Sequence, residues 1–148
     1  MKFLVAGCGS IGRRHIRNLL SLGHTAIATD LLEQSREAAQ AELGVQTFPS
    51  LESGLGQKPD AVLVCTPPST HLEIAKAALE AGCHVFIEKP ISDSLSGIAA
   101  LGSLAKKKRK VVQVGYNLRF ATGLRAMKEA MQSGKYGKPL YAKIQYAQ

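Results

Sequence analysis

Several stretches of the chain carry residue types that can bind a nucleotide or move a proton. The first is the motif Gly7-x-Gly9-x-x-Gly12, which follows an apolar run and precedes a helical pattern. Gly7 permits a tight turn, Gly9 lets a pyrophosphate approach the backbone, and Gly12 lets the helix pack close to the strand. Free N–H groups at the helix start, including those of Ser10 and Ile11, favour an anion. The turn therefore predicts dinucleotide binding, and the alternative is a βα turn that binds no ligand.

An acidic residue lies where a dinucleotide site would need one. Asp30 ends the second apolar run, 18 residues after Gly12, where its carboxylate can accept hydrogen bonds from the adenosine ribose. A 2′-phosphate would meet that carboxylate, and Leu31 and Leu32 follow it without an adjacent arginine, so NAD is favoured over NADP. Arg36, one helical turn further, keeps NADP open. The alternative role for Asp30 is a cap of the following helix.

A proline-containing segment follows the apolar run at residues 61–65. Thr66, Pro67 and Pro68 break the strand and open a helix, and His71 lies near the first turn of that helix. We expect Thr66 and Pro67 to form a rigid wall over the cofactor, with His71 as a polar contact beside it. The alternative is a proline-started helix without a ligand, in which the histidine is structural.

A charged pair follows the next strand run, at residues 84–87. Glu88 and Lys89 come directly after this run, and Pro90 stiffens the turn. Charges at the end of a buried strand are costly unless they are paired or face a cavity. Lys89 is the predicted catalytic residue, because its amine can exchange a proton with a substrate hydroxyl during hydride transfer. The alternative is an ordinary exposed charge pair at a strand end.

Polar residues also follow the run at residues 111–115. Asn117 is expected to bind the carboxamide of a nicotinamide, and Arg119 to bind an anionic group of the substrate. Structural roles in the turn are the alternative for both residues. Tyr116 and Phe120 are interpreted as packing residues.

The elements that must position these residues alternate between strands and helices. The strands are expected over residues 2–6, 25–29, 45–48, 61–65, 84–87 and 111–115. Mostly apolar strand runs that alternate with helices predict an α/β fold, a doubly wound parallel sheet of the Rossmann type. The expected strand order is 3-2-1-4-5-6, with ligands bound outside the carboxyl ends of the strands. Each stretch described above follows a strand, so we expect all of them to meet at one rim.

The C-terminal part of the chain follows a different pattern. Helices are expected over residues 92–108, after good capping residues, and over about residues 122–133. Residues 140–146 alternate between apolar and polar side chains, which is typical of a half-buried strand. We therefore expect a dinucleotide-binding Rossmann domain at residues 1–120. Residues 121–148 are interpreted as a linker helix and the first strand of a second domain that is otherwise absent.

The composition narrows the class of protein. The chain has 148 residues, 45% of them hydrophobic, and no run of 18 apolar residues, so we expect about one domain and no membrane partner. Its start is not a signal-peptide pattern. Three cysteines without CxxC or metal spacing predict buried thiols, a cytoplasmic location and no metal site. The net charge of +8 includes the basic run at residues 106–110, which we interpret as a solvated helix end and not as a nucleic-acid site.

Together these motifs resemble the N-terminal domain of the Gfo/Idh/MocA family of oxidoreductases, named after glucose-fructose oxidoreductase, inositol dehydrogenase and rhizopine catabolism. The resemblance covers essentially the whole chain, and the Glu-Lys-Pro motif after the fifth strand is much more specific than the glycine turn. It implies NAD(P)-dependent oxidation or reduction of sugars, cyclitols, sugar acids or nucleotide sugars. It also implies that Lys89 lies beside nicotinamide and substrate and that Glu88 helps to fix the cofactor. The matching residues are Gly7 to Gly12 with His15, Thr66 to His71, Glu88 to Pro90, and Gly115 to Phe120.

The chain departs from this family in its length. Members carry a second α/β domain that supplies most substrate contacts and the usual oligomer interface, which implies a homo-oligomer for the full-length protein. We therefore expect a piece of a longer enzyme that binds cofactor without turnover. The alternative of another class is a non-catalytic nucleotide-sensing or regulatory module, although sensing needs no proton donor such as Lys89. S-adenosylmethionine is a weaker alternative ligand. Asp30 could bind its ribose, but this ligand would give Glu88-Lys89-Pro90 no role.

Overall fold

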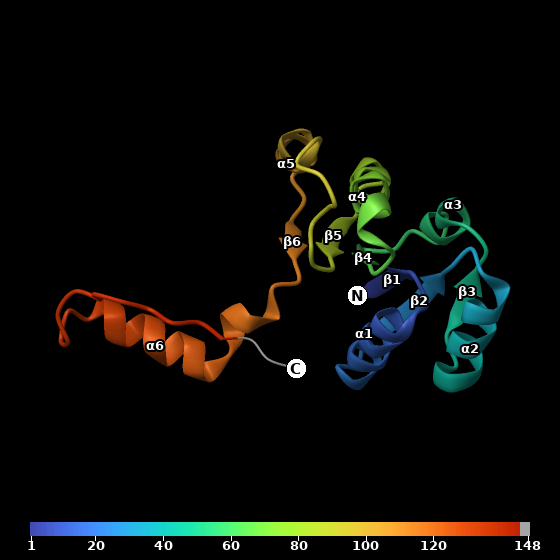
Figure 1. The fold of residues 1–148 in the computed structure, drawn as a ribbon. Helices are drawn as coiled ribbons and strands as arrows, with labels where there is room; N and C mark the ends of the chain where they lie inside the picture. Colours follow the sequence, from blue (N-terminus) through green and yellow to red (C-terminus); the bar gives the residue numbers. More distant parts are fainter. Residues whose placement is uncertain (146–148) are drawn as a thin grey trace. The chain divides into compact units, whose positions relative to one another are not determined.

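The computed structural model describes residues 1–145 of the chain, which divides into two units, Met1–Gly115 and Tyr116–Gln148 (Figure 1). The first unit contains a sheet of six parallel strands in the order β3-β2-β1-β4-β5-β6. The strands are β1 (Lys2–Ala6), β2 (Thr25–Thr29), β3 (Gln46–Phe48), β4 (Ala61–Val64), β5 (His84–Ile87) and β6 (Val112–Val114). The predicted doubly wound fold and its strand order are confirmed, with the three-residue strands β3 and β6 at the two edges.

Helices cover both faces of this sheet (Figure 1). They are α1 (Ser10–Ser21) and α2 (Glu33–Leu43) on one face, and α3 (Leu51–Leu55), α4 (His71–Glu80) and α5 (Ile98–Lys108) on the other. Successive strand residues point to opposite faces, so Leu4 and Ala6 pack on the side of α4 while Val5 packs on the side of α1. This two-sided burial is why the central strands read as uninterrupted apolar runs.

The register of the strands brings their carboxyl ends to one edge of the sheet. Ala6, the last residue of β1, pairs with Thr29 of β2 on one side and with Val64 of β4 on the other. Val64 in turn pairs with Ile87, the last residue of β5. The segments that follow these four residues therefore leave the sheet side by side, and they include the glycine turn and the Glu-Lys-Pro motif.

The segment between β5 and α5 differs from the expectation. The helix predicted from residue 92 begins at Ile98, after Gly97 in a left-handed conformation with φ +85°. Before it, Ser94 N–H donates to Ser92 Oγ at 3.2 Å and Ser96 N–H donates to Ser94 Oγ at 3.1 Å. The serine hydroxyls thus accept backbone N–H groups in a way that competes with helix formation. Ser92 and Ser94, which were expected to lie at the start of the helix, form successive turns instead.

The second unit contains a 3₁₀ turn, Asn117–Phe120, and the helix α6 (Thr122–Gln132), which confirms the helix predicted near residues 122–133. None of the helices in residues 1–145 is long and apolar enough to cross a membrane. Residues 140–145 form no strand, and Tyr146 of the predicted strand lies outside the described residues. A lone strand has no neighbour for its N–H and C=O groups, which is the physical reason for this difference. The assignment of residues 121–148 to a second domain stays a prediction.

Candidate functional site

The glycine turn between β1 and α1 is shaped by three constraints. Gly7 has a φ of +100°, which favours glycine, and a Cβ on it would lie 2.8 Å from the backbone of Cys65. A Cβ on Gly12 would lie 1.8 Å from the carbonyl oxygen of Gly7, so only glycine lets α1 pack this closely. A Cβ on Gly9 would meet no atom within 4 Å. Gly9 therefore borders open space, as the close approach of a pyrophosphate requires.

The first turn of α1 provides backbone donors beside this space. Its first helical hydrogen bond runs from Arg13 N–H to the carbonyl oxygen of Gly9 at 2.9 Å. Among the described residues, no side chain caps the helix and no acidic residue lies in its first turn. The N–H groups of Ser10, Ile11 and Gly12 precede the helical ladder, and the helix dipole adds partial positive charge. This donor set fits a pyrophosphate, and its contact with Ser10 and Ile11 stays a prediction.

Asp30 binds the glycine turn across the sheet edge. Its Oδ2 accepts the backbone N–H of Cys8 at 2.7 Å, and its Oδ1 accepts that of Leu32 at 2.9 Å. Leu32 is the N-cap of α2, which has no side-chain cap, so the alternative role of Asp30 as a helix cap is wrong. A carboxylate offers about four lone-pair sites, so about two remain for ribose hydroxyls. The half-buried carboxylate is thus oriented in advance, and its ribose contact stays a prediction.

Arg36 is engaged with the loop between β2 and α2. Its Nη1 donates to the carbonyl oxygens of Asp30 at 2.8 Å and Leu31 at 3.0 Å. A 2′-phosphate at this place would have to draw the guanidinium from both carbonyls and would also meet the Asp30 carboxylate. Because both groups are already committed to the loop, the arrangement favours NAD over NADP.

The loop after β4 is held by hydrogen bonds of its own. Thr70 Oγ1 lies 2.8 Å from Thr66 Oγ1, and Thr70 N–H donates to the carbonyl oxygen of Pro67 at 3.0 Å. His71 lies beneath this loop and is only 1% exposed, with Nε2 2.7 Å from the carbonyl oxygen of Thr66 and Nδ1 2.9 Å from that of Pro90. The loop is held in place by these contacts, and the role of Thr66 and Pro67 as a wall over the cofactor stays a prediction. The cofactor contact of His71 also stays a prediction, although its buried ring lies within hydrogen-bond distance of carbonyl oxygens from two loops.

Glu88 is paired, but with residues that lie far away in the sequence. Its Oε1 lies 2.7 Å from Nε2 of His15 and 3.9 Å from Nη2 of Arg14, both on α1. Its Oε2 accepts the backbone N–H of Lys89 at 3.1 Å. The carboxylate is 14% exposed, so the alternative of an ordinary exposed charge pair does not describe it. Glu88 instead joins the turn after β5 to the helix that follows the glycine turn.

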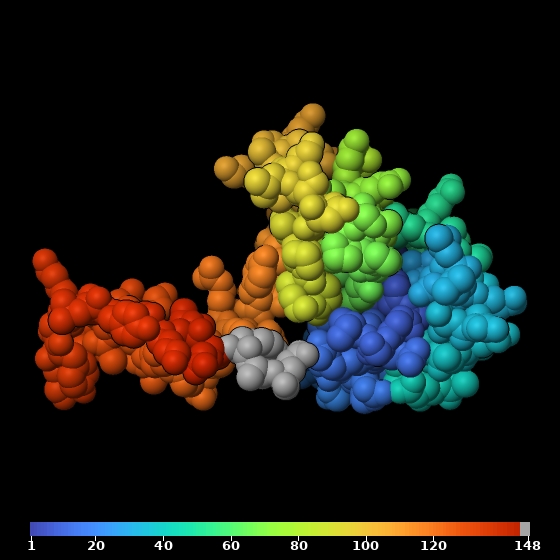
Figure 2. Space-filling view, viewed as in Figure 1, coloured from blue at the N-terminus to red at the C-terminus, as the bar shows by residue number. Residues whose placement is uncertain are grey.

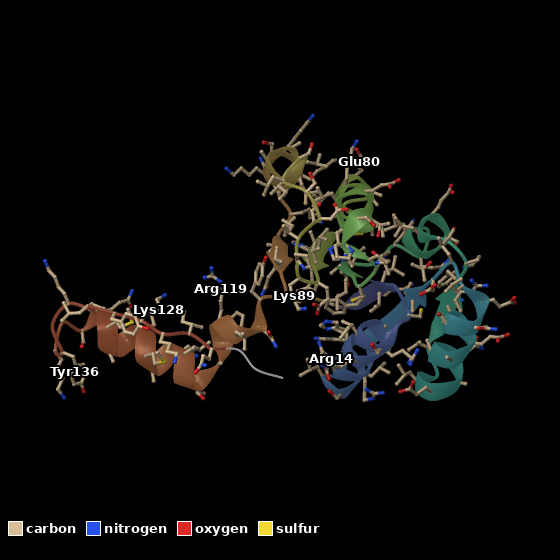
Figure 3. The ribbon with its side chains drawn as sticks, viewed as in Figure 1. Arg14, Glu80, Lys89, Arg119, Lys128 and Tyr136 are labelled. Carbon is tan, nitrogen blue, oxygen red and sulfur yellow. The ribbon has the colours of Figure 1, made fainter. Side chains whose placement is uncertain are left out.

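Lys89 is exposed at the same edge of the sheet (Figure 3). The peptide bond between Lys89 and Pro90 is cis. Within residues 1–145, the Lys89 ammonium forms no ion pair and no hydrogen bond. Its side chain is therefore available to a ligand bound over the sheet edge, while the backbone on either side of it is fixed by Glu88 and His71.

The cysteines at this edge are held as neutral thiols. Burial, with the nearby Asp30 carboxylate, raises the pKa of Cys8 to about 11. Burial, with the nearby Glu88 carboxylate, raises the pKa of Cys65 to about 12. Thiolates are the reactive form of cysteine, so neither thiol is a nucleophile near neutral pH. The cysteines serve as small packing groups, as the sequence indicated.

Asn117 and Arg119 belong to the second unit. Both lie in its 3₁₀ turn with exposed side chains, and Arg119 N–H donates to the carbonyl oxygen of Tyr116 at 3.2 Å. Their contacts with nicotinamide and substrate stay predictions. Tyr116 and Phe120 are exposed, so their expected packing role is wrong for this structure, because a short turn offers them no core.

Two residues of α1 have contacts that sequence reasoning did not assign. Arg13 donates from Nη1 to the carbonyl oxygen of Cys8 at 2.9 Å and forms an ion pair with Glu42 of α2. His15 contacts Glu88. Two signals were available for His15: its position three residues after Gly12, which places it one helical turn from the glycine loop, and its place in the motif that resembles the family.

These features define a Rossmann domain with the donors and the space that a dinucleotide requires. Over residues 1–116 the chain matches the family described as an oxidoreductase family with an NAD-binding Rossmann fold. The match includes the glycine turn, Asp30 and the Glu-Lys-Pro motif. The chain belongs to this family, Gfo/Idh/MocA, and its first unit is an NAD-binding domain.

Relatives and solved structures agree with this assignment. The chain is 33% identical to myo-inositol 2-dehydrogenase of Thermotoga maritima, over 97% of this chain and 44% of that protein. It is 32% identical to UDP-N-acetylglucosamine 3-dehydrogenase of Acidithiobacillus ferrooxidans, over 95% of this chain and 44% of that protein. Its structure matches the WlbA dehydrogenase of Chromobacterium violaceum, which was solved with NADH and UDP-GlcNAcA, with a TM-score of 0.87 and 28% sequence identity. This match covers 93% of this chain and 41% of that one. The chain thus spans less than half the length of these proteins.

Proposed function

We propose that the chain is the cofactor-binding part of an oxidoreductase that acts on a hydroxyl or carbonyl group of a sugar, cyclitol or nucleotide sugar. The observation that carries the proposal is the exposed Lys89 side chain at the sheet edge that also holds the glycine turn and Asp30. The substrate class is supported by the inositol and UDP-N-acetylglucosamine dehydrogenases among the relatives.

Each side chain of the site has a defined task in this proposal. The N–H groups at the start of α1 bind the pyrophosphate, with Gly9 leaving room for it. Asp30 accepts hydrogen bonds from the adenosine ribose. Thr66 and Pro67 form the wall beside the ribose and nicotinamide. These contacts orient the dinucleotide along the sheet edge toward Lys89.

Lys89 exchanges the proton. A bound NAD would supply the hydride acceptor for oxidation of a C–H(OH) group. The Lys89 amine accepts the hydroxyl proton at Nζ as the C=O bond forms, and its ammonium returns that proton in the reverse direction. Asn117 binds the nicotinamide carboxamide and Arg119 an anionic group of the substrate. The remaining substrate contacts belong to the longer protein, so residues 1–148 alone bind cofactor without turnover.

A titration of the chain with NADH and NADPH tests the proposal. The chain has no Trp, so protein emission interferes little with nicotinamide fluorescence. We expect NADH to bind at least about tenfold more tightly than NADPH, a difference of about 1.4 kcal/mol. Equal affinities would overturn the assignment of NAD. A folded chain that binds neither nucleotide would overturn the proposal and favour a module with another ligand.

A further inference from the structure

Lys89 lies between two residues that are each held by a histidine from a different helix. Glu88, before it, contacts His15 of α1, and Pro90, after it, contacts the buried His71 of α4. The Lys89 side chain itself has no fixed partner among the described residues. Its position therefore depends on its backbone, and the backbone depends on its two neighbours.

The contact between His15 and Glu88 is the more informative of the two, because it reaches the cofactor helix. The His15 and Glu88 side chains are only 17% and 14% exposed. The His15 ring also packs edge-on against Phe86 of β5, with ring centroids 5.4 Å apart. In Figure 2 the atoms of the segment after β5 lie next to those of α1, as this contact requires. Both ends of the interaction are thus fixed by packing.

The direction of the hydrogen bonds shows how His15, Glu88 and the backbone of Lys89 are connected. A carboxylate is acceptor-only, so His15 Nε2 carries the hydrogen and donates it to Glu88 Oε1. The other oxygen of the same carboxylate accepts the backbone N–H of Lys89. The exposed Arg14 guanidinium, 3.9 Å from Oε1, adds a favourable charge at longer range. His15 therefore fixes the carboxylate that in turn fixes the backbone of Lys89.

We propose that His15 is a positioning residue that couples the pyrophosphate-binding end of α1 to the Lys89 turn through Glu88. It lies one helical turn beyond the N–H groups that we assign to the pyrophosphate. A small adjustment of α1 on cofactor binding then reaches the proton-transfer residue through two hydrogen bonds. The coupling rests on the proposed function, but the link between His15 and Lys89 exists in the chain without nucleotide and can be measured there.

The test compares three variants of the ¹⁵N-labelled chain by NMR. His15→Leu keeps a side chain against Phe86 but removes the donor, and His15→Gln keeps an N–H donor. His24→Gln is the matched control, because His24 also contacts an aromatic ring, Phe3 at 5.2 Å, but lies away from the turn. The readouts are the amide resonance of Lys89 and the exchange rate of its proton, both without nucleotide.

We expect His15→Leu to shift the Lys89 amide and to speed its exchange by about tenfold, as the loss of a charge-assisted hydrogen bond implies. His15→Gln restores most of the effect, and His24→Gln leaves the amide unchanged. An unchanged amide in His15→Leu, or equal effects of Leu and Gln, overturns the proposal. If His15→Leu does not fold, His15→Phe, which keeps a ring against Phe86 but removes the donor, must produce the same shift.

Adding NADH separates this proposal from the proposed function. In the unmodified chain, we expect NADH to move the resonances of the glycine turn and of Lys89 together, and in His15→Leu we expect the response of Lys89 to be clearly smaller, because only the direct effect of the nicotinamide remains. A chain that binds NADH without any response at Lys89 overturns the coupling alone. A chain that does not bind NADH overturns the proposed function, while the nucleotide-free comparison still decides the role of His15.

Discussion

The carboxylate of Asp30 accepts the backbone N–H of Cys8 at 2.7 Å, which ties the end of β2 to the glycine turn after β1. The same carboxylate accepts the N–H of Leu32 in its own loop. Its orientation is thus set before any ribose arrives, which lowers the cost of ordering the site on binding. The proposed ribose contact and the geometry of the turn therefore share one side chain.

Replacement of Asp30 tests this dependence. Asp30→Ala removes the acceptors for ribose and for Cys8, so we expect NADH to bind about tenfold more weakly or worse, and the preference over NADPH to shrink. Asp30→Asn keeps one acceptor oxygen, so we expect its NADH affinity to lie between those of the unmodified chain and Asp30→Ala. Fluorescence titration of the three proteins measures both affinities. Unchanged NADH affinity in Asp30→Ala would remove Asp30 from the site.

Two glycine replacements separate binding from folding. An alanine Cβ at position 9 enters open space, whereas one at position 12 lies 1.8 Å from the carbonyl oxygen of Gly7. Gly9→Ala should therefore keep its stability within about 1 kcal/mol and lose NADH affinity, because the methyl group occupies the pyrophosphate space. Gly12→Ala should unfold at a clearly lower temperature. Thermal unfolding and NADH titration of both variants decide, and normal NADH binding by Gly9→Ala would contradict the assignment.

Lys89 provides a test of catalysis. In a protein that carries this chain together with a substrate domain, Lys89→Ala should lower kcat by about 10²–10⁴-fold, the usual contribution of a general acid–base residue. Because Lys89 lies outside the pyrophosphate and ribose contacts, NADH affinity of the 148-residue chain should change little. Lys89→Arg is the control, since a guanidinium keeps the charge but does not release a proton. Full activity of Lys89→Arg would indicate a role of charge alone.

The buried thiols predict a loss of stability in alkali. The pKa values of Cys8 and Cys65, about 11 and about 12 in the fold, lie above the ordinary value of 9.0. A raised pKa means that the folded chain keeps protons that the unfolded chain releases. The contribution of the two protonated thiols to the stability of the fold is therefore complete below pH 9. It is lost as the pH rises from 9 through the pKa values of the folded chain. In thermal unfolding followed by circular dichroism, Cys65→Ala should show a shallower decline over this range, and parallel curves would contradict it.

The fold could be predicted because its signals are local and repeated. Each central strand is an apolar run buried on both faces, and each is followed by a helix, so the order of the sheet follows from general rules of connection. The start of α5 could not be predicted in this way. Serine suits a helix cap and a turn equally well, and only the hydrogen bonds of Ser92 and Ser94 distinguish the two.

The candidate site was predictable in position but not in its connections. The sheet edge follows from topology, which is why Asp30 and Lys89 could be named from the sequence. The contact of His15 with Glu88 joins residues 73 apart, and no periodicity signals it. The burial of His71 was equally hidden, because a histidine after a proline turn fits a rim contact as well as a bridge between backbone carbonyls.

The three-residue edge strands β3 and β6 have a consequence for the behaviour of the protein at high concentration. A sheet grows onto another chain through the free N–H and C=O groups of its outer strands, and long flat edges are the main route to ordered aggregates. Here each edge offers only a short row of such groups, while the longer apolar strands lie inside the sheet. The short edge strands of the Rossmann unit therefore protect it against amyloid-like stacking.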